Sequence, residues 1–411
     1  MAAETTLVPT KPTKAAEAER RPGITPRSLL LALVPLLLLA GVMALIFATD
    51  AGLGDRTAPP IETLSVQRVR LPEPGLIEVS VVNDGPDPIT IAQVFVDDAY
   101  WQFTQDPTGT LDRLESTTLS IPYPWVQDEA HAIGIVSATG VVFEAEVPVA
   151  IESPRTDGKS FARFGLVGLY VGIVPVALGL LWFPFLGRLG RRGMHFVLAL
   201  TIGLLLFLVV DMFQEAQEIA LTAPATWNAS LLVPVLAILT AGLLVVVGRS
   251  LRGRHETASP LALSYQIATG IGLHNLGEGL AIGAAFALGE AALGVFLIAG
   301  FTLHNVTEGI GIAAPLVRHR PSLGHFVALA AIAGGPAILG TWLGAFTYSP
   351  LWTTVFLAIG VGAILQVIVE VGRLIARGQE RHQEPTLTWT TFGGVTAGIA
   401  VMYLTALLVT A

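Results

Sequence analysis

Residues 271–285 read IGLHNLGEGLAIGAA, and residues 301–315 read FTLHNVTEGIGIAAP. Each stretch is mostly apolar and contains one polar motif, a histidine followed at once by asparagine and four places later by glutamate. Four residues along an α-helix turn through about 400°, so the histidine and glutamate of each motif share one helix face. The asparagine, three places before the glutamate, extends the same polar ridge. Two apolar helices with such ridges predict a helical membrane protein with a polar site inside it.

The composition of the whole chain agrees with this prediction. Of its 411 residues, 53% are hydrophobic and only 13% are charged, whereas soluble domains have about 25% charged residues. This composition excludes a disordered, collagen-like or nucleic-acid-binding chain. The chain has no cysteine, which excludes disulfides, thiolate metal sites and cysteine nucleophiles.

Eight apolar stretches follow residue 160, and each is long enough to cross a lipid bilayer as a helix. We therefore expect an eight-helix transport domain over residues 161–411, preceded by a transmembrane anchor at 27–49 and a flexible cytoplasmic tail at 1–26. A cleaved signal peptide is the alternative for the anchor, although the apolar stretch is long for that class. The eight stretches are 163–187, 194–220, 230–248, 260–287, 291–316, 323–347, 351–375 and 389–410.

Residues 59–152 follow a different pattern, in which short alternating runs are separated by Gly, Pro and Asp turns. Examples are LIEVSVVN at 76–83 and TTLSIPY at 117–123. The pattern predicts a small all-β domain, an Ig-like sandwich. A copper-binding cupredoxin would need two histidines and a cysteine, whereas this segment contains only His131. We interpret it as a structural or interaction module whose protein partner the sequence does not identify.

The distribution of charge predicts the topology. Residues 50–157 carry a net charge of −13, and the remainder carries +5. Arginine clusters occur in alternate loops of the bundle, and the loops between them have no lysine or arginine. By the positive-inside rule, the N-terminus is cytoplasmic, while the β domain and the C-terminus are extracytoplasmic, in a multi-pass protein of the plasma or inner membrane. The cytoplasmic clusters are Arg188/Arg191/Arg192, Arg249/Arg252/Arg254, Arg318/Arg320 and Arg373/Arg377/Arg381.

The paired motifs predict a metal site. Two facing helices would contribute imidazoles, carboxylates and amides to one pocket, and this donor set suits zinc, iron, manganese or cobalt better than calcium. For a single motif, a hydrogen-bonded pair that holds two helices together is an equal alternative; two copies on consecutive helices favour metal ligands. The candidate ligands are His274, Asn275, Glu278, His304, Asn305 and Glu308.

An enzymatic function is not expected. A zinc protease would need an HExxH motif, whereas here asparagine follows each histidine and glutamate takes the last place. No serine or cysteine nucleophile lies in a suitable context, and nothing indicates an organic cofactor. Three further acids, Asp211, Glu215 and Glu218, lie in the second of the eight stretches. Glu215 and Glu218 could attract cations to an entrance or could simply face the headgroups, and the acidic β domain could also concentrate cations.

The motifs HNLGEGLAIGAA and HNVTEGIGIAAPL resemble the fourth and fifth helices of the ZIP (Zrt/Irt-like) divalent-metal transporters, particularly the bacterial GufA-like branch. The resemblance covers roughly residues 163–411. It implies an eight-helix fold with an outward C-terminus and movement of divalent metal ions, zinc above all, into the cytoplasm. It also implies alternating access by an elevator-like or rocking rearrangement. The metal is then the transported substrate and not a resident cofactor.

The resemblance also implies roles for individual residues. Glu370 resembles an acid of the seventh helix near the cytoplasmic exit, and Asp211 falls where the second helix often places a metal-contacting residue. The implied primary ligands are His274, Glu278, His304 and Glu308, and the implied neighbouring ligands of a second site are Asn275 and Asn305.

Three departures from the family pattern leave questions open. Gly335 stands before Pro336, where the family often has a bridging glutamate, so one or two metals per site are both open. The loop between the third and fourth stretches contains only His255, which argues against metal sensing by that loop. The anchor and the β domain are additions to the eight-helix plan. A metal-binding sensor or assembly subunit without transport is therefore the alternative function, and the sequence leaves homodimerisation open.

Overall fold

The structure is a computed structural model that describes residues 26–49, 59–252, 259–317, 319, 321–380, 383, 385 and 387–410. The expected tail at 1–26 lies almost wholly outside the described residues, as do His255 and several arginines of the predicted cytoplasmic loops. Residues 1–60 and 61–411 form two separate units.

The described part of the first unit contains the helix α1 (Pro26–Ala48). Large apolar side chains along it are exposed, including Leu31 at 70% and Leu37 at 69%. A helix that is apolar all round needs an apolar environment or a large core to cover it. Its apolar part runs over Leu33–Ile46, within the region expected to anchor the chain.

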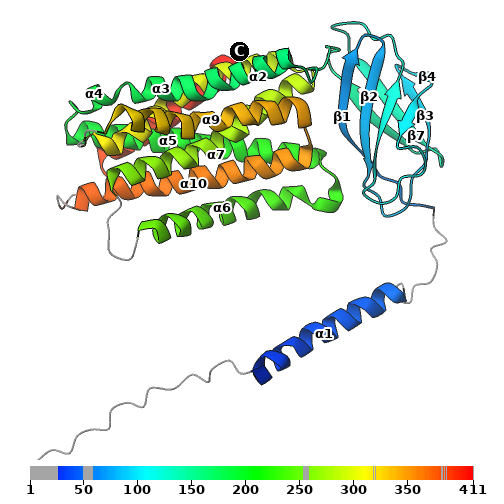
Figure 1. Ribbon diagram of the computed structural model, residues 1–411, viewed down its shortest axis with the longest axis horizontal. Coiled ribbons are helices and arrows are strands. Elements are labelled where there is room, and N and C mark those ends of the chain that lie inside the picture. The colour runs from blue at the N-terminus through cyan, green and yellow to red at the C-terminus, as the bar shows by residue number, and fades with distance from the viewer. Residues whose placement is uncertain are drawn as a thin grey trace, which may run out of the picture. The chain divides into compact units, whose positions relative to one another are not determined.

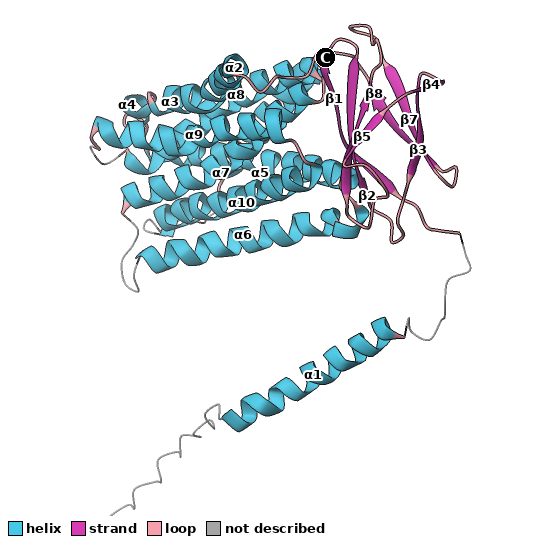
Figure 2. Cartoon of the chain, turned by 45° about the vertical axis from the view of Figure 1, so that its right-hand side comes forward, coloured by secondary structure: helices cyan, strands magenta, loops and turns pink. Residues whose placement is uncertain are grey.

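The second unit begins with eight antiparallel strands in two four-stranded sheets, which Figure 2 draws in magenta. One sheet has the order β1-β2-β6-β5 and the other β4-β3-β7-β8. The strands are β1 (Leu64–Glu73), β2 (Leu76–Asn83), β3 (Ile91–Val96), β4 (Ala99–Trp101), β5 (Thr104–Asp106), β6 (Ser116–Ile121), β7 (His131–Ser137) and β8 (Val142–Val147). The prediction of a small all-β region is confirmed.

Alternation of side chains explains the β region. In β2, every second residue is buried, from Ile77 through Val79 and Val81 to Asn83. Successive residues of a strand point to opposite faces, so this pattern presents one apolar face. β2 pairs with β6 in the register Val79↔Leu119, and both residues are fully buried. The two sheets together enclose one apolar core.

Helices make up the rest of the unit and lie side by side (Figure 1). Helical structure covers all eight apolar stretches of the sequence. The elements are α2 (Gly158–Gly168), the π-helical turn η2 (Leu169–Ile173), α3 (Val174–Leu180), α4 (Phe183–Leu186), α5 (Arg191–Thr222), the 3₁₀ turn η3 (Ala225–Trp227), α6 (Ala229–Arg252), α7 (Pro260–Ala287), α8 (Ala291–Ala313), the 3₁₀ turn η4 (Ala314–Leu316), α9 (Leu323–Thr347), α10 (Pro350–Glu380) and α11 (Trp389–Thr410).

Among the described residues, six helices are long and apolar enough to span a membrane. They correspond to α2–α4, α5, α6, α8 with η4, α9 and α10. The remaining two expected spans, α7 and α11, are helical but are not among the six, and the apolar part of α11 is shorter, over Trp389–Leu404. The chain is a multi-pass helical protein, and eight spans remain a prediction.

Small residues bring the site-bearing helices close together. A Cβ on Gly279 of α7 would lie 2.2 Å from the backbone oxygen of Ala337 in α9, and one on Gly340 of α9 would lie 2.2 Å from that of Leu276. Glycines therefore let the two backbones touch, as small residues do at helix contacts in membranes. α8 approaches α3 in the same way, because a Cβ on Gly309 would lie 2.2 Å from the oxygen of Val176.

Candidate metal centre

The two polar motifs meet inside the bundle. His274 and Glu278 lie on α7, and His304 and Glu308 lie on α8; their side chains are 0 to 4% exposed. The ligand atoms of His274, Glu278 and His304 all lie within 4.8 Å of one another, close enough to hold one metal ion. The helical spacing of four residues puts the histidine and glutamate of each motif on one helix face. The packing of α7 against α8 brings the two motifs together, so that His304 of α8 contacts Glu278 of α7.

One carboxylate oxygen is the centre of this cluster. Oε1 of Glu278 lies 2.9 Å from Nε2 of His274 and 2.5 Å from Nε2 of His304. Oε1 of Glu308 lies 3.7 Å from Nε2 of His274. Around a tetrahedral zinc ion, with bonds of about 2.0–2.2 Å, ligand atoms would stand about 3.3 Å apart. Oε1 of Glu278 stands closer than this to both histidine nitrogens, so these atoms need to separate by about 0.4 and 0.8 Å to admit an ion.

The orientation of His274 suits a metal ligand. Its Nδ1 lies 2.8 Å from the sulfur of Met212 in α5. A proton on Nδ1 in this contact leaves the lone pair on Nε2, the nitrogen that faces the carboxylates, and metal-binding histidines are typically held through their second nitrogen in this way. Met212 was not among the predicted site residues, and its position next to Asp211 is the only sequence signal for it.

The two asparagines use their amide groups to tie helices together. Nδ2 of Asn275 donates to the carbonyl of Ala333, in the turn of α9 before Pro336. Nδ2 of Asn305 donates to Oε2 of Glu278 and to the carbonyl of Val171, each at 3.0 Å. Val171 lies in the π-helical turn η2, a local irregularity that occurs often at functional sites. Nothing in the amino-acid pattern indicates this turn.

Several buried oxygens of the site have no hydrogen-bond partner within the described ranges. They are both carboxylate oxygens of Glu308 and the amide oxygens of Asn275 and Asn305. Burying a polar atom without a partner costs about 1–3 kcal/mol. Oxygen atoms left unpaired beside two imidazoles fit a donor set that is completed by a cation.

The other predicted residues lie around this cluster. Asp211 borders a cavity of about 180 Å³ between α5, α8 and α11, which also reaches His304. It is not one of the three residues whose ligand atoms converge. Glu370 of α10 is 2% exposed and accepts a hydrogen bond of 2.8 Å from Arg373. Gly335 lies within α9, and a Cβ there would meet nothing within 4 Å.

Comparison with known proteins adds nothing to this description. The chain matches no protein-family model, and no curated protein matches its sequence.

Proposed function

We propose that the protein is a membrane transporter that moves divalent transition-metal cations, zinc in particular, into the cytoplasm through the His/Glu cluster of α7 and α8. The observation that carries the proposal is the convergence of His274, Glu278 and His304 inside a bundle of membrane-spanning helices. The resemblance of the paired motifs to ZIP transporters supports it. In this proposal α7 and α11 are also membrane spans, which gives eight spans and an outward C-terminus.

Charge balance supports a divalent cation as the substrate. The carboxylates of Glu278 and Glu308 together carry two negative charges, and the two neutral imidazoles add donors without adding charge. A divalent ion in their midst gives a site with no net charge. Burying a charge is costly unless it is paired, so this site lowers the cost of holding a dication inside a bilayer.

The ligands come from α7 and α8, and each helix is packed against different neighbours. α7 packs mainly against α9 and α10, while α8 packs mainly against α3 and α7. Met212 and Asp211 reach the same region from α5. A displacement of α7 and α8 relative to α5 would therefore change which side of the membrane the site faces, which is what alternating access requires.

The proposal is tested by uptake into liposomes that contain a zinc-sensitive dye. We expect the double variant Glu278→Ala, Glu308→Ala to lose nearly all uptake, because neither the ligands nor the balancing charge remain. Glu380→Gln serves as the matched control, since it neutralises an exposed glutamate at the end of α10. Equal uptake by the double variant and the wild type would show that the site is wrongly assigned.

A metal-binding sensor or assembly subunit is the second candidate, favoured by the β region that the bundle does not need in order to bind metal. This candidate predicts stoichiometric metal binding without flux. Mass spectrometry of the bound metal together with tracer uptake separates the two functions. Competition among zinc, iron, manganese and cadmium identifies the preferred ion.

A further inference from the structure

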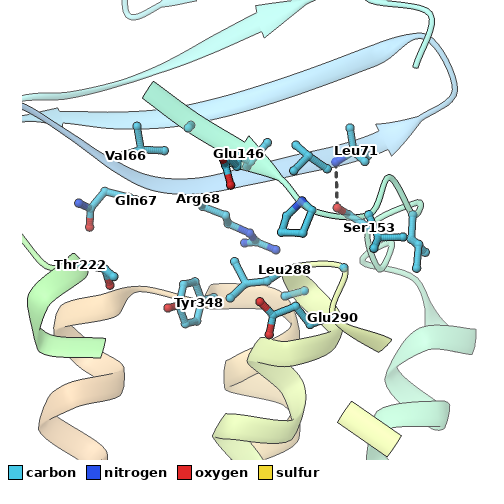
Figure 3. Close-up of a pocket in the computed structure, with 18 of the residues that line it drawn as sticks. Val66, Gln67, Arg68, Leu71, Glu146, Ser153, Thr222, Leu288, Glu290 and Tyr348 are labelled. Atoms are coloured by element: carbon cyan, nitrogen blue, oxygen red, sulfur yellow. Dashed lines mark hydrogen bonds between the residues drawn. The ribbon is translucent and has the colours of Figure 1, made fainter. Parts of the chain in front are cut away.

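A cavity of about 280 Å³ lies between the β region and the ends of the helices. Its walls come from β1 and β8 on one side and from the ends of α5, α7 and α9 and the start of α10 on the other. Figure 3 shows Arg68 pointing from β1 into this cavity, with Glu290 and Tyr348 on the helix side. The function proposed above assigns no role to this cavity.

Several hydrogen bonds fix the β region to the bundle. Asp84 accepts hydrogen bonds from the backbone N–H groups of Ala225 and Thr226, at the turn between α5 and α6. Arg68 donates to the carbonyl oxygens of Phe346 at 3.3 Å and Ala345 at 3.4 Å, in the last turn of α9. The roof of the cavity is therefore held in a defined position over the helix ends.

The guanidinium of Arg68 lies where the C-terminal end of α9 attracts a positive charge. The carbonyls at the C-terminal end of a helix carry partial negative charge and attract cations. The guanidinium lies against these carbonyls, and its Nε is buried without a hydrogen-bond partner among the described residues. Burial, followed by repulsion from Arg70, lowers the pKa of Arg68 to about 10, so the side chain still carries its positive charge near neutral pH.

The cavity that Arg68 enters also has oxygen atoms in its walls. The carboxylate of Glu290 and the phenol of Tyr348 line it on the helix side. Carboxylate oxygens are ligands that hard divalent cations prefer. A divalent ion held by these oxygens would share the cavity with the guanidinium and be repelled by it.

Acidic residues also lie on α5, the helix whose last residue, Thr222, forms part of the cavity wall. Glu215 lies one helical turn from Asp211 on the same face of this helix, and Asp211 shares the second cavity with His304. The helix that borders the outer cavity therefore also carries a carboxylate to the cavity beside the metal centre.

We propose that the cavity beneath the β region is an entrance chamber for divalent cations, and that the charge of Arg68 competes there with the incoming ion. The inference rests on the proposed transport function for its direction of flow. It gives the β region a part in transport, because β1 supplies the competing charge. Loss of that charge then strengthens cation entry without altering the buried site.

The first test measures uptake by the reconstituted full-length chain over a range of metal concentrations. A unit charge about 10 Å from a divalent ion in a water-like dielectric changes its binding about fourfold. We expect Arg68→Gln to lower the half-saturating metal concentration by about that factor with the maximal rate unchanged, and Arg68→Lys, which keeps the charge, to stay near the wild type. Arg70→Gln is the matched control, because Arg70 lies two residues along β1 and is 3.6 Å from Glu78.

The second test does not depend on transport. The chain has no cysteine, so Leu288→Cys introduces a single thiol in the cavity wall. We compare its labelling rates with a cationic and an anionic methanethiosulfonate, and expect Arg68→Gln to raise the cationic-to-anionic ratio several-fold. Mn²⁺ should then slow the labelling more strongly than it does with Arg68 in place.

The two tests separate the two proposals. A labelling ratio that is the same for Arg68→Gln and Arg70→Gln would overturn the entrance chamber, even if uptake depends on Glu278 and Glu308. A raised ratio with protection by Mn²⁺, in a protein that shows no metal flux, would retain the cation chamber and reject the transport function.

Discussion

Two fully buried asparagines, one in the β region and one in the helix bundle, differ in whether all their polar atoms have hydrogen-bond partners. Asn83 in the β region donates to the carbonyls of Asp87 and Leu111, and its amide oxygen accepts from the N–H of Gly85, each at 2.9 Å. Asn305 in the bundle also donates twice, yet its amide oxygen has no partner among the described residues. The amide of Asn83 is therefore fully satisfied by the fold, whereas the free oxygen of Asn305 lies beside the carboxylates of the metal centre.

The comparison extends to how each region packs. The β region uses alternating branched side chains to fill a core between two sheets, whereas α7 and α9 meet through glycines with almost no side chain between them. Close backbone contact makes the bundle sensitive to single methyl groups.

The largest expected effect tests this packing difference. Gly340→Ala would place a Cβ 2.2 Å from the oxygen of Leu276, and we expect it to lower the free energy of unfolding by about 3 kcal/mol. Gly335→Ala in the same helix meets nothing within 4 Å and should instead stabilise the protein by about 0.5–1 kcal/mol, because alanine favours helix. Thermal unfolding in detergent, followed by circular dichroism, measures both. Equal effects would contradict the close α7–α9 contact.

The next prediction addresses the asparagines themselves. Asn83→Ala removes three buried hydrogen bonds, and we expect it to cost about 3 kcal/mol, seen as faster hydrogen exchange in β2 and β6 of the full chain. Asn305→Ala should weaken metal binding about tenfold by releasing the carboxylate of Glu278, measured by competition with a metal-sensitive dye. If Asn305→Ala left metal binding unchanged, the hydrogen bond from Asn305 to Glu278 would have no part in holding the ligand.

The smallest expected effect concerns pH and the β region. Burial alone would raise the pKa of Asp97, but hydrogen bonds from Tyr123, the N–H of Ala132 and His131 outweigh it and hold the pKa below its usual range. A lowered pKa contributes stability that is present above the unfolded-state value of about 4 and is lost as the pH falls through the folded-state value.

We therefore expect the stability difference between the wild type and Asp97→Asn to be constant above about pH 5 and to shrink below about pH 4. Hydrogen exchange in β3 and β7 at several pH values measures it. Since the side chain of Asp97 is 40% exposed, the effect should be small. A difference that grew on acidification would contradict the sign of the pKa shift.

Periodicity alone was enough to predict much of this protein. Long apolar stretches predict helices, because backbone polar groups in lipid need hydrogen-bond partners within the chain. All eight stretches are helical in the structure. The alternation of apolar and polar residues over 59–152 likewise predicted the strands from local sequence alone. The spacing of four residues also predicted that the histidine and glutamate of each motif share a helix face, since it depends only on helix geometry. The structure places His274 2.9 Å from Glu278.

Only the tertiary structure decided which of these groups meet. Helix packing decides that Glu278 contacts both histidines and that Met212 contacts His274. It also decides that Asn305 reaches the π-helical turn. Sequence separation gives no guide to these contacts. The position of Arg68 over the end of α9 also depends on packing. Its two hydrogen bonds to α9 join residues that lie 277 and 278 positions apart in the sequence. Local periodicity determines elements and the faces they present, whereas the contacts between elements depend on how their surfaces fit together.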